Sequence, residues 1–246
     1  MTVLRVRGLS KRYGAFQALR DVSFDVSSGE LVALIGPNGA GKTTCFNLLS
    51  GQLVPDAGEV ELDGRPIGQR APREIWRLGV GRTFQITATF GSMTVRENVQ
   101  LALVSHHRAH YSLLGSLGER HVADADALLA RVGILEQAER PCALLAYGDL
   151  KRVELAVALA NSPRLLLMDE PTAGMAPEER GELMALAAKL ARSEGIAVLF
   201  TEHDMDVVFG HADRVVVLHS GEIIASGRPS EIRDDARVQE VYLGAA

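Results

Sequence analysis

Cysteine is scarce in this sequence of 246 residues: only Cys45 and Cys142 are present, far apart along the chain. Their spacing fits neither a disulfide framework nor a cysteine metal-binding motif, and such sparse cysteine is typical of a reducing compartment. We therefore expect both side chains to be small apolar residues of the core. The 47% hydrophobic content is sufficient for a sizeable core.

Long hydrophobic runs are absent. No stretch reaches the roughly 18 to 20 consecutive apolar residues of a membrane helix, and the N-terminus lacks the regions of a signal peptide. We expect a soluble chain, whose membrane role, if any, requires docking onto another subunit. Basic charge is not in excess either, since 26 lysines and arginines face 31 acidic residues. No overall basic field indicates a nucleic-acid partner.

A glycine-rich segment follows the first continuous apolar run. Residues 31–35 predict a strand buried on both faces, residues 36–43 read G-P-N-G-A-G-K-T, and residues 42–50 predict a helix. The glycines let backbone N–H groups turn toward an anion, Lys42 can reach the β and γ phosphates, and the Thr43 hydroxyl is placed for Mg²⁺. The sequence thus predicts a phosphate-binding loop for ATP. Its residues are Gly36, Pro37, Asn38, Gly39, Ala40, Gly41, Lys42, Thr43 and Thr44.

A second apolar run, residues 165–168, ends in the acidic pair Asp169 and Glu170. A phosphate loop alone would also fit GTPases, kinases and motor ATPases, so this pair is needed to narrow the prediction. At the C-terminal end of a strand, Asp169 can hold Mg²⁺ through water, and Glu170 can polarise an attacking water molecule. The two motifs together predict an enzyme that hydrolyses ATP.

The remaining pattern predicts an α/β fold: a P-loop NTPase core with an N-terminal antiparallel β layer and an inserted α-helical subdomain. Residues 1–30 alternate as strands do, and residues 94–161 are helical, with Thr94 and Glu97 spaced as a capping box. We predict one domain, residues 1–246, with a catalytic core at 1–93 and 162–246 and a helical subdomain at about 94–161. Residues 214–225 predict a hairpin, followed by a short helix near Glu231.

These motifs in this order resemble the ATP-binding cassette (ABC) ATPases over essentially the whole chain. The resemblance implies that Tyr13, in K-R-Y-G-A-F-Q-A-L, stacks on adenine. It implies that Gln85, in R-T-F-Q, senses the Mg²⁺ and water site and relays its state to a membrane partner. It further implies that His203, in T-E-H-D, contacts the γ-phosphate. The implied catalytic residues are Lys42, Glu170 and His203, and the implied Mg²⁺ ligands are Thr43, Gln85 and Asp169.

The signature segment departs from the family pattern, because residues 145–149 read L-A-Y-G-D in place of L-S-G-G-Q. Ala146 has no hydroxyl, so contact with a γ-phosphate would depend on Gly148, neighbouring N–H groups and the positive end of the following helix. The resemblance implies that Ala146, Tyr147, Gly148 and Asp149 act in trans, on the nucleotide of a second cassette chain. Asp149 is alternatively a plain helix N-cap, a role compatible with the first.

L-A-Y-G-D resembles the cassette subunits of bacterial branched-chain amino acid importers. The segments R-T-F-Q, D-E-P-T-A-G-M-A-P, T-E-H-D-M-D-V-V-F and V-Y-L-G share this resemblance, and the long helical insertion resembles the larger of that subgroup's two cassette chains. Two departures concern the interface: Leu150 replaces the more usual glutamine or arginine, and Met175–Ala176 replaces Leu-Asn.

The resemblance implies an ATPase subunit peripheral to the cytoplasmic face of the inner membrane, with ATP and Mg²⁺ as cofactors. Its implied partners are a second cassette, more readily in a heterodimer than a homodimer, permease subunits and, indirectly, a periplasmic or lipid-anchored binding protein. Two alternatives stay open, the ATPase of a lipid or lipopolysaccharide exporter and a mechanical ATPase acting on ribosomes or DNA. The transported molecule is also open. A groove for the permease is expected near Phe84, Ile86, Phe90 and Met93, which are equally plausible as core residues.

Overall fold

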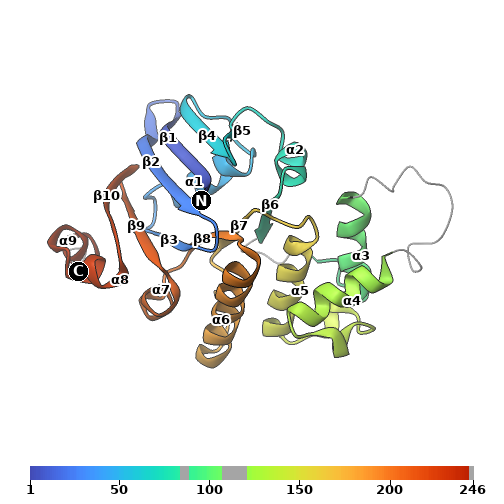
Figure 1. The fold of residues 1–246 in the computed structure, drawn as a ribbon. Coiled ribbons are helices and arrows are strands. Elements are labelled where there is room, and N and C mark those ends of the chain that lie inside the picture. Colours follow the sequence, from blue (N-terminus) through green and yellow to red (C-terminus); the bar gives the residue numbers. More distant parts are fainter. Residues whose placement is uncertain (84–88, 107–120, 244–246) are drawn as a thin grey trace.

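Two β-sheets and a group of helices make up the structure (Figure 1). It is a computed structural model that describes residues 1–83, 89–106 and 121–243, with residues 242 and 243 described by their backbone only. The antiparallel sheet has the order β2-β1-β4-β5. Its strands are β1 (Thr2–Tyr13), β2 (Phe16–Ser27), β4 (Ala57–Leu62) and β5 (Arg65–Pro66). Asp63 and Gly64 join β4 to β5 with φ values of 49° and 74°, as the tightest hairpin turn requires.

The second sheet has the order β10-β9-β3-β8-β7-β6. Its strands are β3 (Leu31–Ile35), β6 (Val80–Thr83), β7 (Leu165–Asp169), β8 (Ala197–Thr201), β9 (Arg214–His219) and β10 (Glu222–Gly227). All neighbouring pairs are parallel except β9 and β10, which form the predicted hairpin. Because parallel strands point the same way, β3 and β7 deliver the phosphate loop and the acidic pair to the same sheet edge.

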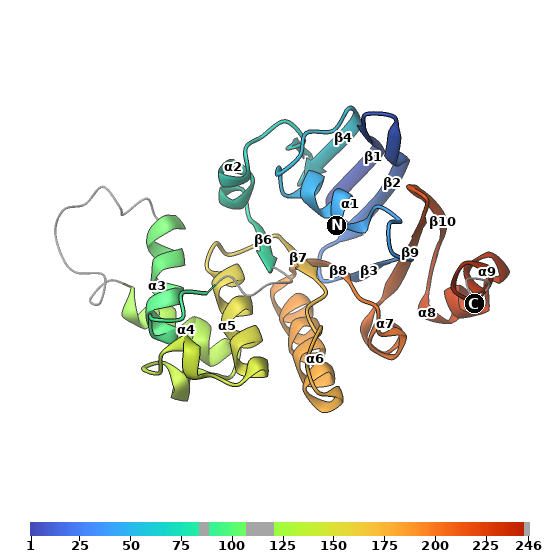
Figure 2. The ribbon, with the colours of Figure 1, turned by 180° about the vertical axis from the view of Figure 1, so that it is seen from behind.

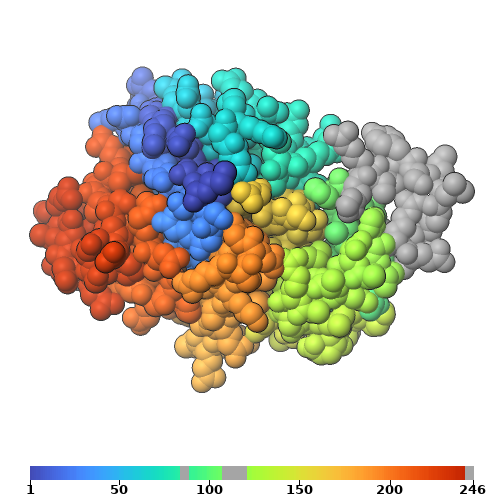
Figure 3. All heavy atoms as spheres, viewed as in Figure 1, coloured from blue at the N-terminus to red at the C-terminus, as the bar shows by residue number. Residues whose placement is uncertain are grey.

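The helices are α1 (Lys42–Leu49), α2 (Pro72–Arg77), α3 (Val95–His106), α4 (Val122–Arg131), α5 (Tyr147–Leu159), α6 (Pro177–Glu194), α7 (Met205–His211), α8 (Pro229–Asp234) and α9 (Ala236–Leu243). The sequence analysis expected only one helix after the hairpin, whereas two are present. Helices α3 to α5 gather at one end of the molecule, and α8 and α9 lie at the other (Figures 2 and 3). The predicted chain divisions at 94 and 161 stay a prediction.

Alternate residues of the parallel strands face two separate cores. In β3, Val32 and Leu34 pack on the side of α1 and the antiparallel sheet, whereas Leu31, Ala33 and Ile35 pack on the side of α5 and α6. This two-sided burial explains the continuous apolar run at 31–35. Helix α1 therefore lies between the two sheets, as both ribbon views show (Figures 1 and 2).

The predicted capping box begins α3. The Thr94 backbone N–H donates to Glu97 Oε2 at 2.7 Å, and the Glu97 N–H donates to Thr94 Oγ1 at 3.2 Å. Cys45 and Cys142 are buried and not disulfide-bonded, which confirms their expected place in the core. Burial raises the pKa of Cys45 to about 12 and that of Cys142 to about 11, so both thiols stay protonated at neutral pH. No helix in the described ranges is long and apolar enough to cross a membrane.

Candidate functional site

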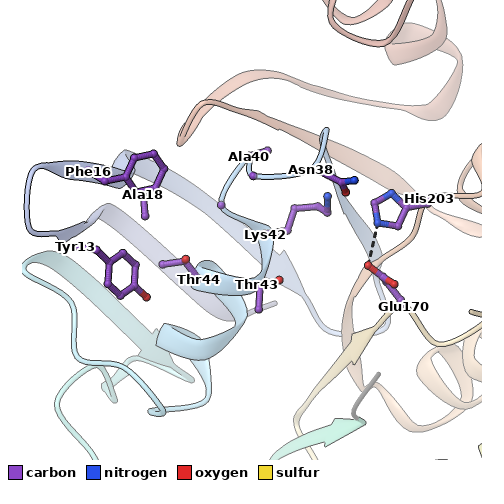
Figure 4. Close-up of a pocket in the computed structure, with 12 residues that line it drawn as sticks. Tyr13, Phe16, Ala18, Asn38, Ala40, Lys42, Thr43, Thr44, Glu170 and His203 are labelled. Atoms are coloured by element: carbon purple, nitrogen blue, oxygen red, sulfur yellow. Dashed lines mark hydrogen bonds and ion pairs between the residues drawn. The ribbon is translucent and has the colours of Figure 1, made fainter. Parts of the chain in front are cut away.

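A cavity of about 250 Å³ lies against the loop between β3 and α1 (Figure 4). It is lined by Tyr13, Phe16, Ala18, Asn38, Gly39, Ala40, Gly41, Lys42, Thr43, Thr44, Glu170 and His203. In Figure 4 two aromatic rings, from Tyr13 and Phe16, stand at one end, and Glu170 and His203 stand at the other. The loop and Lys42 lie between them, so the cavity has an aromatic end, a central loop and an acidic end.

The loop backbone is shaped by glycine at two positions with left-handed φ, 81° at Gly39 and 108° at Gly41. A Cβ atom on Gly41 would also lie only 2.6 Å from the carbonyl oxygen of Ala18. Gly41 is the N-cap of α1 and no side chain caps the helix, whose first turn also contains no acidic residue. The first N–H groups of α1 are therefore available to an anion, as the sequence predicted for this loop.

Lys42 reaches back across the loop. Its Nζ donates hydrogen bonds to the carbonyl oxygens of Gly36 at 2.7 Å and Pro37 at 3.2 Å, and the residue is only 8% exposed. Burial lowers the pKa of the Lys42 ammonium, and the charges of Glu170 and Asp169 oppose this shift. The ammonium thus lies at the centre of the loop and within the field of the acidic pair.

The acidic pair follows β7 and is held in place by β8. Thr201 Oγ1 donates to Asp169 Oδ1 at 2.9 Å, and the Glu170 backbone N–H donates to Thr201 Oγ1 at 3.0 Å. Asp169 also pairs with the Arg82 guanidinium at 3.3 Å. Glu170 has a left-handed φ of 47°, a conformation that costs a non-glycine residue on the order of 1 kcal/mol. The hydrogen bond to Thr201 therefore holds the Glu170 backbone in a strained conformation.

His203 meets Glu170 at the acidic end, with its Nε2 atom 2.9 Å from Glu170 Oε1. The two residues come from different strand ends, Glu170 after β7 and His203 after β8. Glu170 is half-buried and His203 is exposed to the cavity side. A carboxylate oriented by an imidazole beside a phosphate loop can polarise a water molecule that attacks the terminal phosphate.

Phe16 and Ala18 also line the cavity, and the sequence analysis missed both. Phe16 begins β2 directly across the hairpin turn from Tyr13, with which it is paired in register. Both aromatic rings are exposed, which is unusual for large apolar side chains without a ligand. An aromatic residue close after Tyr13 in K-R-Y-G-A-F was the available signal.

The signature residues lie elsewhere. Helix α5 begins at Tyr147 with Ala146 as its N-cap, so the alternative interpretation of Asp149 as the N-cap is wrong. The helix begins earlier than that interpretation assumed, and Asp149 lies within its first turn. There the negative charge of the carboxylate interacts favourably with the positive end of the helix dipole. None of these residues, all in the described part of the chain, lines the cavity. Gly148 is buried against Glu179, with room for no side chain without displacing that carboxylate, and Tyr147 is exposed.

Three residues named from the sequence, Phe84, Gln85 and Ile86, lie outside the described residues. Of the other two expected at a partner groove, Phe90 is 56% exposed and Met93 is half-buried. Neither is an ordinary core residue.

The sequence of this chain is similar to known protein families and to individual proteins. A family model described as ABC transporter matches residues 19–173, and one described as branched-chain amino acid ATP-binding cassette transporter matches residues 222–246. The chain is 40% identical to the high-affinity branched-chain amino acid transport ATP-binding protein LivG of Salmonella typhimurium, over 99% of this chain and 98% of that protein.

Two solved structures are similar along nearly the whole chain. A nucleotide-free ATP-binding cassette from an ABC transporter has a TM-score of 0.88 at 31% identity, covering 98% of this chain and 99% of that one. A dimeric post-hydrolysis state of an ATP-binding cassette, bound to ADP and phosphate, has a TM-score of 0.78 at 27% identity, covering 92% and 98%. These likenesses confirm the predicted fold class.

Proposed function

The chain belongs to the ABC transporter family, and on that basis we propose that it is the ATP-hydrolysing subunit of an importer of branched-chain or related amino acids. The order of groups along the cavity carries the ATPase part of this proposal. An aromatic end, a loop of free N–H groups with a lysine, and a Glu170–His203 pair match the base, the phosphates and the attacking water in turn. The relatives that transport branched-chain amino acids support the substrate class.

In the proposed reaction, the first N–H groups of α1 and Lys42 hold the phosphates, and His203 orients Glu170. Glu170 then polarises the water that attacks the γ-phosphate. Because phosphoryl transfer asks little covalent chemistry of a protein, these positioned charges would supply most of the rate. As the water oxygen bonds to the γ-phosphorus, the bond to the oxygen shared with the β-phosphate breaks, which gives ADP and phosphate, and the proton of the water leaves by way of Glu170.

Two of the three residues that the sequence assigned to Mg²⁺ offer oxygen atoms, the ligands that this ion prefers. Thr43 lines the cavity, and Asp169 ends β7, next to the cavity-lining Glu170. Within the described residues no group of three histidine, cysteine or acidic side chains could hold a metal ion. Mg²⁺ would therefore be bound together with the nucleotide, and when bound it neutralises charge on the phosphates.

The partner we propose is a second cassette chain, in a heterodimer by preference and a homodimer otherwise. Ala146, Tyr147, Gly148 and Asp149 would then meet the nucleotide of that partner. The dimeric neighbour bound to ADP and phosphate supports this arrangement. Each monomer would hold half a site, because its own cavity lacks the signature.

We place the subunit on the cytoplasmic face of the inner membrane, docked under a permease. An apolar cavity of about 210 Å³ between α2, β6 and α5, lined in part by Ile75, Trp76 and Val157, supports a docking surface there. Exposed Phe90 lies in the chain segment that leads from β6 to α3. Lipid export is less favoured, because the similarity at residues 222–246 is to branched-chain amino acid transporters. A mechanical ATPase is least favoured, since 26 lysines and arginines against 31 acidic residues give no excess of basic charge for a nucleic-acid partner.

Uptake by cells tests the transport assignment. Deleting the gene is expected to reduce uptake of radiolabelled leucine, isoleucine or valine at low concentration, and a wild-type copy is expected to restore it. A Glu170→Gln copy would not restore uptake, because the permease would lose its energy source. Unchanged uptake of all three amino acids after deletion, with ATPase activity intact in the purified protein, would overturn the substrate class and leave the ATPase standing.

Replacing either aromatic residue is expected to weaken nucleotide binding. Stacking of a base on an aromatic ring contributes about 1 to 3 kcal/mol, so Tyr13→Ala and Phe16→Ala should each lower ATP affinity roughly 5- to 150-fold. Titration with a fluorescent ATP analogue measures this. Tyr13→Trp is the matched control, since it keeps a stacking surface and should bind normally. ADP should be affected as strongly as ATP, and normal affinity in Phe16→Ala would remove Phe16 from the base site.

A further inference from the structure

Arg82 occupies a position that none of the predicted roles covers. It lies on β6, which pairs with β7 so that Arg82 is in register with Leu167. Its side chain is 10% exposed. A buried guanidinium requires several acceptors and a negative partner, because removing its charge from water is costly. Its contacts therefore indicate what it is there to hold.

Two hydrogen bonds and a contact with an aromatic ring anchor Arg82 to the far end of α1, the helix that follows the phosphate loop. Its Nη1 donates to Asn47 Oδ1 at 3.0 Å and to Ser50 Oγ at 2.7 Å, and its guanidinium lies 5.9 Å from the Phe46 ring centre. Ser50 is the C-cap of α1, the negative end of the helix. Arg82 thus fixes the end of α1 opposite to the end that faces the phosphates.

Another hydrogen bond of Arg82 reaches the carboxylate of Asp169, the proposed Mg²⁺ ligand. Its Nη2 donates to Asp169 Oδ2 at 3.3 Å, while Thr201 Oγ1 donates to Asp169 Oδ1 at 2.9 Å. Each carboxylate oxygen therefore has a donor from a neighbouring strand, Arg82 from β6 and Thr201 from β8. Burial lowers the pKa of the Arg82 guanidinium, and the Asp169 charge opposes the shift. The pair is mutually dependent, since each ion lies where it would otherwise be poorly solvated.

We propose that Arg82 is a positioning residue for hydrolysis, which fixes the Asp169 carboxylate, one of the groups that would hold Mg²⁺, relative to α1. The inference rests on the proposed function. A ligand-orienting partner of this kind is typically worth about 10- to 100-fold in metal affinity. The opposing effect is repulsion between Arg82 and Mg²⁺. Orientation is favoured because the guanidinium is itself held by hydrogen bonds to Asn47 and Ser50 at the far end of α1.

The test compares Arg82→Gln with the wild-type protein in nucleotide binding, with and without Mg²⁺. The probe is a fluorescent ATP analogue titrated at a series of Mg²⁺ concentrations and in EDTA. We expect Arg82→Gln to raise the Mg²⁺ concentration for half-maximal tightening about tenfold. Affinity in EDTA should stay within about twofold, because Arg82 does not line the nucleotide cavity. Manganese in place of Mg²⁺ should show the same shift.

Two controls separate positioning from folding. Arg164→Gln removes the arginine of an exposed Arg164–Asp63 pair at 3.0 Å and should change nothing. Trp76, the only tryptophan of the sequence, lines the same apolar cavity as Arg82, so unchanged Trp76 emission shows intact packing there. If Arg82→Gln does not fold, Arg82→Lys replaces it. Lysine keeps the charge, but its single nitrogen cannot reach Asn47, Ser50 and Asp169 as the planar guanidinium does, and a smaller shift in the same direction is expected.

The possible results distinguish failure of the inference about Arg82 from failure of the proposed function. An unchanged Mg²⁺ requirement in Arg82→Gln, with reduced turnover, would assign Arg82 a purely structural role and overturn the inference. A lowered Mg²⁺ requirement would show that repulsion dominates and would overturn it as well. Failure of the wild-type protein to bind the ATP analogue at any Mg²⁺ concentration would instead refute the proposed function.

Discussion

Glu170→Gln is expected to lower the rate of ATP hydrolysis roughly 10²- to 10⁴-fold while ATP still binds. Glutamine has the shape of glutamate, and its carbonyl oxygen can still accept a hydrogen bond from His203 Nε2, which lies 2.9 Å from Glu170 Oε1. It cannot accept a proton, so the attacking water loses its base. Phosphate release from the purified protein measures the rate, and equilibrium binding of ATP measures what remains.

The same variant should accumulate an ATP-dependent dimer, because a site that binds ATP without hydrolysing it stays closed. Gel filtration with ATP and Mg²⁺ detects the dimer, together with the second cassette chain if the dimer is a heterodimer. Glu194→Gln is the matched control, since Glu194 pairs with Arg131 on the surface of α6, away from the cavity. Unimpaired turnover with no dimer in Glu170→Gln would show that Glu170 does not have the proposed role.

Local pattern was enough to predict much of the site. The run at 31–35 and the glycines after it predicted a strand and loop that the structure contains, because an apolar run and closely spaced glycines are local signals, although β3 itself pairs with the distant β8 and β9. The capping box at Thr94 was also predicted correctly, since both its hydrogen bonds span three residues. Signals that act within a few residues can be read from the order of amino acids alone.

Contacts between residues on different strands could not be predicted from the sequence pattern, because they depend on which strands are neighbours and in which register they pair. The Glu170–His203 contact and the Arg82–Asp169 pair join residues on different strands, and they exist because β6, β7 and β8 are neighbours in parallel register. The sequence implied roles for Glu170 and His203 without predicting that they touch, and it gave Arg82 no role. The interpretation of Asp149 as an N-cap was wrong for a local reason. Aspartate is a common N-cap residue, but α5 begins at Tyr147, two residues before Asp149.

The place of the signature segment has a consequence for regulation under the proposed function. The residues that line the cavity include none from the start of α5. Under the proposed function, nucleotide bound by one chain would be completed by the α5 end of another. Hydrolysis would then depend on assembly, which would link ATP turnover to the transporter complex.

Lys42→Met is expected to weaken ATP binding roughly 10- to 150-fold, because it removes charge-assisted hydrogen bonds of about 1.5 to 3 kcal/mol. Turnover should fall further, roughly 10²- to 10³-fold below that of the wild-type protein at saturating ATP, since the ammonium also stabilises the charge that develops on the phosphates. Methionine keeps the apolar stem of this residue, only 8% exposed, so the fold is retained. Isothermal titration and phosphate release measure the two effects, and thermal unfolding checks the fold.

The pH dependence of binding identifies the ammonium as the cause. Burial lowers the Lys42 pKa, so this group loses its charge at a lower pH than an exposed lysine does. Wild-type affinity for ATP should therefore fall as the pH rises toward that pKa, whereas Lys42→Met should show no such fall. A neutral amine keeps two N–H donors for the Gly36 and Pro37 carbonyls, so deprotonation would act mainly through the loss of the positive charge that faces the phosphates. Equal pH dependence in both proteins would exclude Lys42 as the titrating group and assign the effect to another residue of the cavity.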